Sequence, residues 1–177
     1  MESPRTRMNV AMMYGAYYGL ANVLVMFISY MLGADMQSKL PTLLNYILLV
    51  VFMTMAIKSH RDEDLGGYIS YGKSVGTGIL ISVFGGAIVG VFSIVLFTLI
   101  DPAMTERILD TARQQMIENG LPDDQVEQAV EISRQFLTPI WLFVFGLVGS
   151  AVVGLILSLI VSVFTKREAS PFDSNLG

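Results

Sequence analysis

VGTGILISVFGGAIVGVFSIVLFTLI, residues 75–100, is an uninterrupted apolar stretch that contains no Lys, Arg, Asp, Glu or His. A helix needs about 20 such residues to cross a hydrocarbon layer about 30 Å thick. Three further stretches, residues 10–32, 40–57 and 140–164, are equally free of charged residues and of histidine. The sequence therefore predicts an all-α integral membrane protein with four transmembrane helices.

The composition of the whole chain agrees with this class. Of its 177 residues, 53% are hydrophobic and 15% are charged, and the mean hydropathy is +0.60. A soluble domain usually carries about 25% charged residues. The chain contains no cysteine, which excludes disulfides and thiolate metal sites. Its net charge of −4 gives no reason to expect binding to nucleic acid.

The N-terminus shares one feature with signal peptides, because Arg5 and Arg7 precede an apolar run. The run is too long for a signal peptide, and the segment after it, residues 33–40, lacks a small-x-small cleavage site. We therefore expect residues 10–32 to be retained as the first span.

Lys and Arg residues in the short flanks of the spans predict the orientation. If all four helices cross, seven of these residues lie on one side, while the opposite short loop has only Lys39. The long loop, residues 101–138, adds three Arg residues against eight acidic ones. Both termini are therefore expected in the cytoplasm. The seven residues are Arg5, Arg7, Lys58, Arg61, Lys73, Lys166 and Arg167.

Small residues recur at every fourth position in three of the spans, which places each set on one helix face. Such faces let helix backbones approach closely in lipid, so we expect spans three and four to pack as a tight pair. Span one should join through its cytoplasmic half, and span two should lie more peripherally. The packing residues are Gly15 and Gly19 in span one, Gly78, Ser82, Gly86 and Gly90 in span three, and Gly146, Ser150, Gly154 and Ser158 in span four.

The same small-residue faces have a second interpretation, as the lining of a pore. Pores and transporters usually place charged or strongly polar residues at mid-membrane. The most polar candidates in the spans are Asn22, Asn45 and Thr54. Packing is therefore the favoured interpretation.

The long loop predicts an extracytoplasmic amphipathic helical hairpin between spans three and four. Residues 105–120 form the first expected helix, with Thr105 as its cap, and residues 125–136 form the second, capped by Asp123 or Asp124. The hairpin either covers the bundle or headgroups, or presents its apolar face to a partner. The expected segments are 1–9 (cytoplasmic), 10–57 (spans one and two), 58–74 (cytoplasmic connector), 75–100 (span three), 101–138 (hairpin), 139–164 (span four) and 165–177 (cytoplasmic tail).

GYISYGKS, residues 67–74, matches the phosphate-binding pattern G-x-x-x-x-G-K-[ST]. A working P-loop follows a buried strand and needs a remote Asp for magnesium. Here the octapeptide follows the acidic run 62–64 and leads into a transmembrane helix, and Asp101 lies at the far end of that helix. We therefore interpret the match as chance and expect neither nucleotide binding nor enzymatic activity.

The connector, residues 58–74, has two interpretations. It is either a solvated turn with interfacial tyrosines, or a docking site for a partner protein or an anionic lipid headgroup. His60, the only histidine, is expected to be a solvated loop residue rather than a metal ligand. The candidate contact residues are Arg61, Asp62, Gly66, Gly67, Tyr68, Tyr71 and Lys73.

Four segments carry a family resemblance: RDEDLGGYISYGKS (61–74), IDPAMTERI (100–108), ENGLPDDQVEQA (118–129) and LTPIW (137–141). They resemble a bacterial family of small four-span membrane proteins, the domain of unknown function 4199 family, over roughly residues 8–165. The resemblance implies residence in the bacterial inner membrane. It implies no activity, cofactor or catalytic residue.

Three functional hypotheses follow. The favoured one is a non-enzymatic accessory or scaffold subunit, because the spans contain no charge and the sequence contains no nucleophile–base pair or metal constellation. The alternative is a small-solute or lipid-handling transporter acting as a homo-oligomer, and the third is a membrane enzyme or nucleotide-dependent device. The expected partners are membrane lipid and either a membrane protein or a second copy of the chain, without a cofactor.

Overall fold

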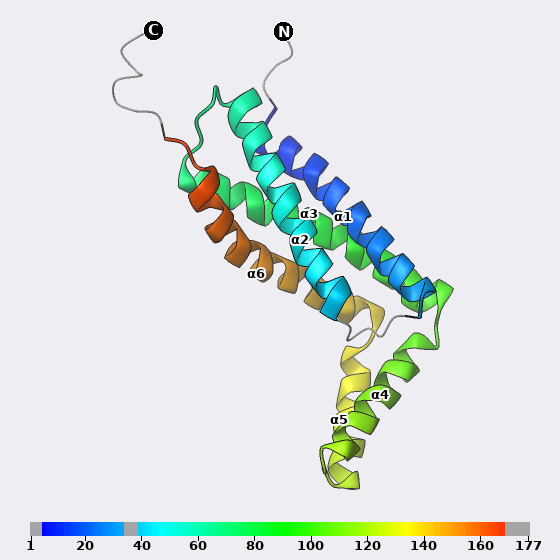
Figure 1. Ribbon diagram of the computed structural model, residues 1–177. Helices are drawn as coiled ribbons and strands as arrows, with labels where there is room; N and C mark the ends of the chain where they lie inside the picture. The colour runs from blue at the N-terminus through cyan, green and yellow to red at the C-terminus, as the bar shows by residue number, and fades with distance from the viewer. Residues whose placement is uncertain (1–4, 34–38, 169–177) are drawn as a thin grey trace, which may run out of the picture. The chain divides into compact units, whose positions relative to one another are not determined.

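The computed structural model describes residues 5–33 and 39–168, in two compact units. The first comprises Met1–Val89 with Leu147–Gly177, and the second runs from Gly90 to Gly146. The described residues are almost entirely helical and include no strand, only an isolated bridge (Figure 1). The helices are α1 (Arg7–Met31), α2 (Lys39–Ser59), α3 (Tyr71–Val95), α4 (Met104–Glu118), α5 (Asp123–Phe136) and α6 (Pro139–Thr165), with π-helical turns η1 (His60–Asp64) and η2 (Leu96–Ile100).

Four helical segments are long and apolar enough to cross a membrane, which confirms the predicted all-α class and its four membrane-length helices. In the first unit, α1 and α3 run in one direction and α2 and α6 in the other (Figure 1). The chain thus has the helices of a multi-pass membrane protein. The four segments are Arg7–Met31, Lys39–Asp64, Tyr71–Ile100 and Pro139–Thr165.

Small residues bring α3 and α6 close together in the first unit. A Cβ added at Gly78 would lie 2.5 Å from Cβ of Ser158, and one at Gly86 would lie 2.7 Å from Cβ of Ser150. These distances are shorter than real carbon contacts, so the helices meet at this separation only because glycine has no side chain. The α3–α6 seam consists of three facing pairs: Gly78 with Ser158, Ser82 with Gly154, and Gly86 with Ser150.

The seam does not include Gly146, the first of the predicted packing positions of α6. A Cβ at Gly146 would meet nothing within 4 Å, whereas one at Gly90, in the same unit, would meet the ring of Phe143. On the other side of α3, glycines of α1 make the close approach. A Cβ at Gly15 would lie 3.1 Å from the Ile81 carbonyl oxygen, and one at Gly19 would lie 3.1 Å from that of Gly85.

The expectation that span two lies peripherally is wrong for the second half of α2. Met53, Ala56 and Ile57 are fully buried. The sulfur of Met53 lies 2.9 Å from the position of a Cβ on Gly78, so α2 reaches the α3–α6 seam. The long, flexible Met side chain fills the space that the absent glycine side chain leaves.

The second unit contains α4 and α5, which pack against each other through Leu109, Val126 and Val130. Arg134 of α5 forms an ion pair with Glu106 of α4. The hydrogen bond to Glu106 raises the pKa of Arg134.

The predicted caps of α4 and α5 are wrong by one or two positions. α4 begins at Met104, ahead of Thr105, because the Ala103 carbonyl oxygen already accepts from the Arg107 amide at 3.2 Å, which makes Ala103 the N-cap. At α5, Pro122 is the N-cap, and Asp123 and Asp124 lie in the first turn. In that turn their negative charges interact favourably with the positive end of the helix dipole.

The seam predicts a strong position dependence for glycine substitution in α6. Gly154→Leu should destabilise the protein by about 1–3 kcal/mol, because the new side chain overlaps Ser82. Gly149→Leu is the matched control on the same helix, since a Cβ there meets nothing within 4 Å. Thermal unfolding in detergent, followed by circular dichroism, measures both. Equal melting temperatures for the two variants would contradict the seam.

Candidate functional site

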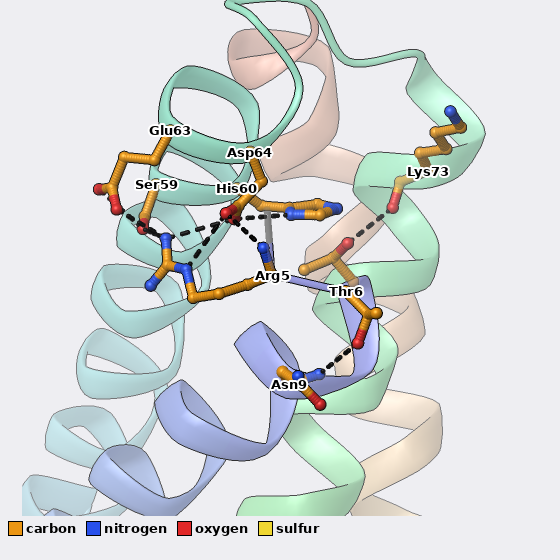
Figure 2. Close-up of polar contacts among 9 residues, drawn as sticks. Arg5, Thr6, Asn9, Ser59, His60, Glu63, Asp64 and Lys73 are labelled. Carbon is orange, nitrogen blue, oxygen red and sulfur yellow. Dashed lines mark hydrogen bonds and ion pairs between the residues drawn. The ribbon is translucent and has the colours of Figure 1, made fainter. Parts of the chain in front are cut away.

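Polar side chains gather where α2 ends, and the helix geometry brings them there (Figure 2). α2 runs to Ser59 and continues directly into the π-helical turn η1. Residues four apart therefore lie on one face. Ser59 Oγ donates to Glu63 Oε1 at 3.0 Å, and His60 Nδ1 lies 3.1 Å from Asp64 Oδ2. The side chains of His60 and Asp64 are 5% and 4% exposed.

Arg5 closes this group from the start of the chain. Its backbone amide donates to Asp64 Oδ1 at 2.9 Å, and its guanidinium donates to both Asp64 oxygens at 3.2 Å. Nη2 also donates to Ser59 Oγ at 2.9 Å and to Glu63 Oε2 at 2.6 Å. The hydrogen bond to Asp64 raises the pKa of Arg5. We call these five residues the Arg5 cluster: Arg5, Ser59, His60, Glu63 and Asp64.

The prediction that His60 is a solvated loop residue is wrong. Its helix does not stop at the end of the apolar stretch but continues through Ser59 and η1, which turns His60 inward to 4% exposure. The spacing Ser59–Glu63 and His60–Asp64 is a signal that sequence analysis could have used. The participation of Arg5 has no local signal, since it lies 59 residues from Asp64.

Arg61 fastens the connector to α6. Its guanidinium pairs with Asp62 at 2.6 and 2.9 Å and donates from Nη1 to the Thr165 carbonyl oxygen at 3.1 Å. A second tie is the backbone bridge between Ile69 and Arg167, whose two hydrogen bonds measure 2.8 and 3.0 Å. The connector is therefore bound to the end of α6 at two separate points.

Further contacts fix the remaining predicted contact residues. The Arg167 guanidinium lies 5.6 Å from the centre of the Tyr68 ring, a cation–π distance. Tyr71 donates its hydroxyl to the Leu159 carbonyl oxygen at 3.1 Å. Gly66 and Gly67 turn the chain at φ of +66° and +92°, conformations that favour glycine.

The structure thus divides the predicted contact residues into two groups. Arg61, Gly67, Tyr68 and Tyr71 hold the connector in place and are only partly exposed. Three are exposed: Asp62, Gly66 and Lys73. With the exposed Ser70, these three residues form what we call the connector face.

The Arg5 cluster does not have the arrangement of a catalytic centre. The Ser59 hydroxyl donates to Glu63, while His60 pairs with Asp64, so Ser59 and His60 are not joined as nucleophile and base. Within residues 5–33 and 39–168, no group of three or more His, Cys, Asp or Glu side chains is placed to hold a metal ion. The bonds of the cluster are those of a structural tie between the N-terminal segment and the end of α2.

The fold defines a class, a multi-pass α-helical membrane protein with a fastened polar connector. The chain belongs to the family described as "protein of unknown function (DUF4199)", whose sequence model matches residues 13–167. This match confirms the resemblance drawn from the sequence. No similar curated protein and no similar solved structure was found.

The Arg5 cluster predicts energetic coupling between Arg5 and Asp64. Arg5→Gln leaves the buried Asp64 carboxylate without its cation and should cost about 1–3 kcal/mol of unfolding free energy. Adding Asp64→Asn to Arg5→Gln should cost less than the sum of the two single variants. Denaturant unfolding in mixed micelles measures the cycle.

Lys58→Gln is the control for this cycle, because Lys58 is exposed near the end of α2 and its charge acts on Asp62, which lies outside the Arg5 cluster. Its effect should stay within about 0.5 kcal/mol. Strictly additive effects of Arg5→Gln and Asp64→Asn would show that the pair contributes nothing.

Proposed function

We propose that the protein is a non-enzymatic accessory or scaffold subunit of the bacterial inner membrane. Its connector face is the contact surface for a membrane-protein partner. The observation that carries this proposal is the fastening of the connector to α6 through Arg61 and through the Ile69–Arg167 bridge. A loop that only joins two spans needs no such ties. A surface held in one shape pays less entropy on binding.

The bonds of the octapeptide support a non-enzymatic role. A P-loop cradles phosphate with free backbone amides. Here the Gly67 amide donates to the Arg61 carbonyl oxygen at 2.8 Å, and the Ile69 amide donates to Arg167 at 2.8 Å. The Ser74 amide donates to the Ser70 carbonyl oxygen at 3.0 Å. Because these amides already donate to carbonyl oxygens of the chain, they are not free to bind phosphate. This favours interpreting GYISYGKS as a chance match.

The seam favours a packing role over transport. A transport path along α3 and α6 would have to run between their small-residue faces. A Cβ at Gly78 already lies too close to Ser158, and one at Gly86 too close to Ser150. Residues in such contact leave no room for a solute. We therefore keep the accessory role as the proposal.

The orientation follows from the basic flanks, with both termini and the connector in the cytoplasm and the α4–α5 pair outside. An aromatic cluster at the start of α6 supports a membrane boundary there. The Trp141 and Phe145 rings are stacked at 5.5 Å, and Phe136 lies 6.1 Å from each. All three are exposed, and aromatic side chains of this kind gather at membrane interfaces.

The accessory role predicts a heteromeric complex after gentle extraction. Native mass spectrometry should find a second polypeptide in fixed stoichiometry with the chain. Ser70→Arg should remove it without lowering the melting temperature, because the Ser70 side chain is exposed. Lys39→Glu, at the start of α2, is the charge-reversal control and should retain the partner. A wild-type chain that appears only as monomer or homo-oligomer would refute the role.

The membrane boundary predicts the depth of the single tryptophan of the chain. In liposomes, lipids brominated near the headgroup should quench Trp141 fluorescence more than lipids brominated near the chain ends. Moving the probe one helical turn, with Trp141→Phe and Phe145→Trp, should shift its depth by about 6 Å along α6. Fluorescence that no brominated lipid quenches would place Trp141 in water and contradict the boundary.

A further inference from the structure

The cations at the end of the bundle where α2 stops fall into paired and unpaired sets. Arg5 is paired with Glu63 and Asp64, and Arg61 is paired with Asp62. Arg7 and Lys73 form no ion pair or hydrogen bond through their side chains within residues 5–33 and 39–168, and both are exposed. Figure 2 shows the Lys73 side chain extending away from the Arg5 cluster.

The two unpaired cations share one region of α3. A Cβ on Gly76 would lie 3.0 Å from Nη1 of Arg7 and 3.7 Å from its guanidinium carbon. The missing side chain of Gly76 therefore lets the Arg7 guanidinium rest against α3. Lys73 precedes Gly76 by three residues, which places it on the same helix face. Beside it, Gly72 is exposed, and a Cβ there would meet nothing within 4 Å.

The Arg7 guanidinium thus lies against the helix face that carries Lys73, and no carboxylate of the described residues is paired to either cation. The backbone adds to the imbalance. α1 begins at Arg7 and α3 at Tyr71, and neither has an acidic residue in its first turn. Helix N-termini carry a partial positive charge, so cations there are unfavourable unless an anion compensates them.

We propose that Arg7 and Lys73, brought together on α3 by Gly76, bind the phosphate of an anionic phospholipid. Guanidinium and ammonium groups are the side chains that bind phosphate oxygens. Arg7 and Tyr71 are the first residues of two membrane-length helices, so the cations lie at the level where lipid headgroups begin. A lipid is therefore the source of the phosphate, rather than a soluble ion. This site rests on the proposed membrane placement and shares Lys73 with the connector face, while Arg7 lies outside that face.

The test measures lipid binding to the purified full-length chain by native mass spectrometry. Phosphatidylglycerol and phosphatidylcholine with identical acyl chains are titrated separately. Each basic residue near a membrane surface contributes about 1 kcal/mol toward anionic lipid, so two should give at least about a tenfold preference for phosphatidylglycerol. Arg7→Gln with Lys73→Gln should abolish the preference.

Two further variants separate the site from general charge. Gly76→Leu keeps both cations but displaces the Arg7 guanidinium, so it should reduce the preference severalfold. Lys58→Gln removes an exposed cation on α2 and should leave the preference unchanged. If the double variant does not fold, Gly76→Leu and Lys73→Gln decide the question singly.

Three results would overturn the inference: equal binding of the two lipids by the wild type, an undiminished preference in the double variant, or equal losses in Lys73→Gln and Lys58→Gln. Inorganic phosphate is the probe for a free-anion site. Displacement of phosphatidylglycerol by millimolar phosphate would assign the cations to a soluble anion and reject the lipid. Because the isolated chain is used, failure here leaves the accessory role standing, and loss of the partner leaves the lipid site standing.

Discussion

The contact between α3 and α6 is the constraint on which the rest of the bundle depends. Lipid offers apolar helices no hydrophobic reason to associate, so they must gain by close packing. The pairs Gly78–Ser158 and Gly86–Ser150 supply that packing at a separation that any larger residue would prevent. Met53 of α2 reaches the same contact, which brings three of the four long helices of this unit together at one point.

That packing also fixes the polar end of the bundle. Once α2 is drawn in at Met53 and Ile57, its continuation into η1 turns His60 and Asp64 inward, where Arg5 compensates the carboxylate. Arg61 then reaches the end of α6. Most charged residues of the connector are therefore paired and hold it in place. Those without an ion pair among the described residues, Lys73 among them, are the ones available for binding.

Sequence patterns predict the local features well and the long-range polar contacts poorly. The four-residue spacing of small residues indicates which faces of α3 and α6 approach each other, because helical periodicity alone decides it. Arg5 is joined to Asp64 across 59 residues, and no spacing rule connects them. The run of charged residues after residue 57 favours a loop, so the sequence does not predict that the helix continues through Ser59 into η1. The small-residue pattern does not reveal the role of Met53 either, because α2 packs with a flexible side chain rather than with glycine.

The central claim is that the connector face lies in the cytoplasm and the α4–α5 pair on the opposite side. Because the chain has no cysteine, single cysteines at the exposed residues Ser70 and Gln114 report their own compartments. Intact cells are treated with a membrane-impermeant maleimide. We expect labelling at Gln114→Cys before permeabilisation and at Ser70→Cys only after it. Labelling of Ser70→Cys in intact cells would contradict the account, whether or not Gln114→Cys is labelled as well.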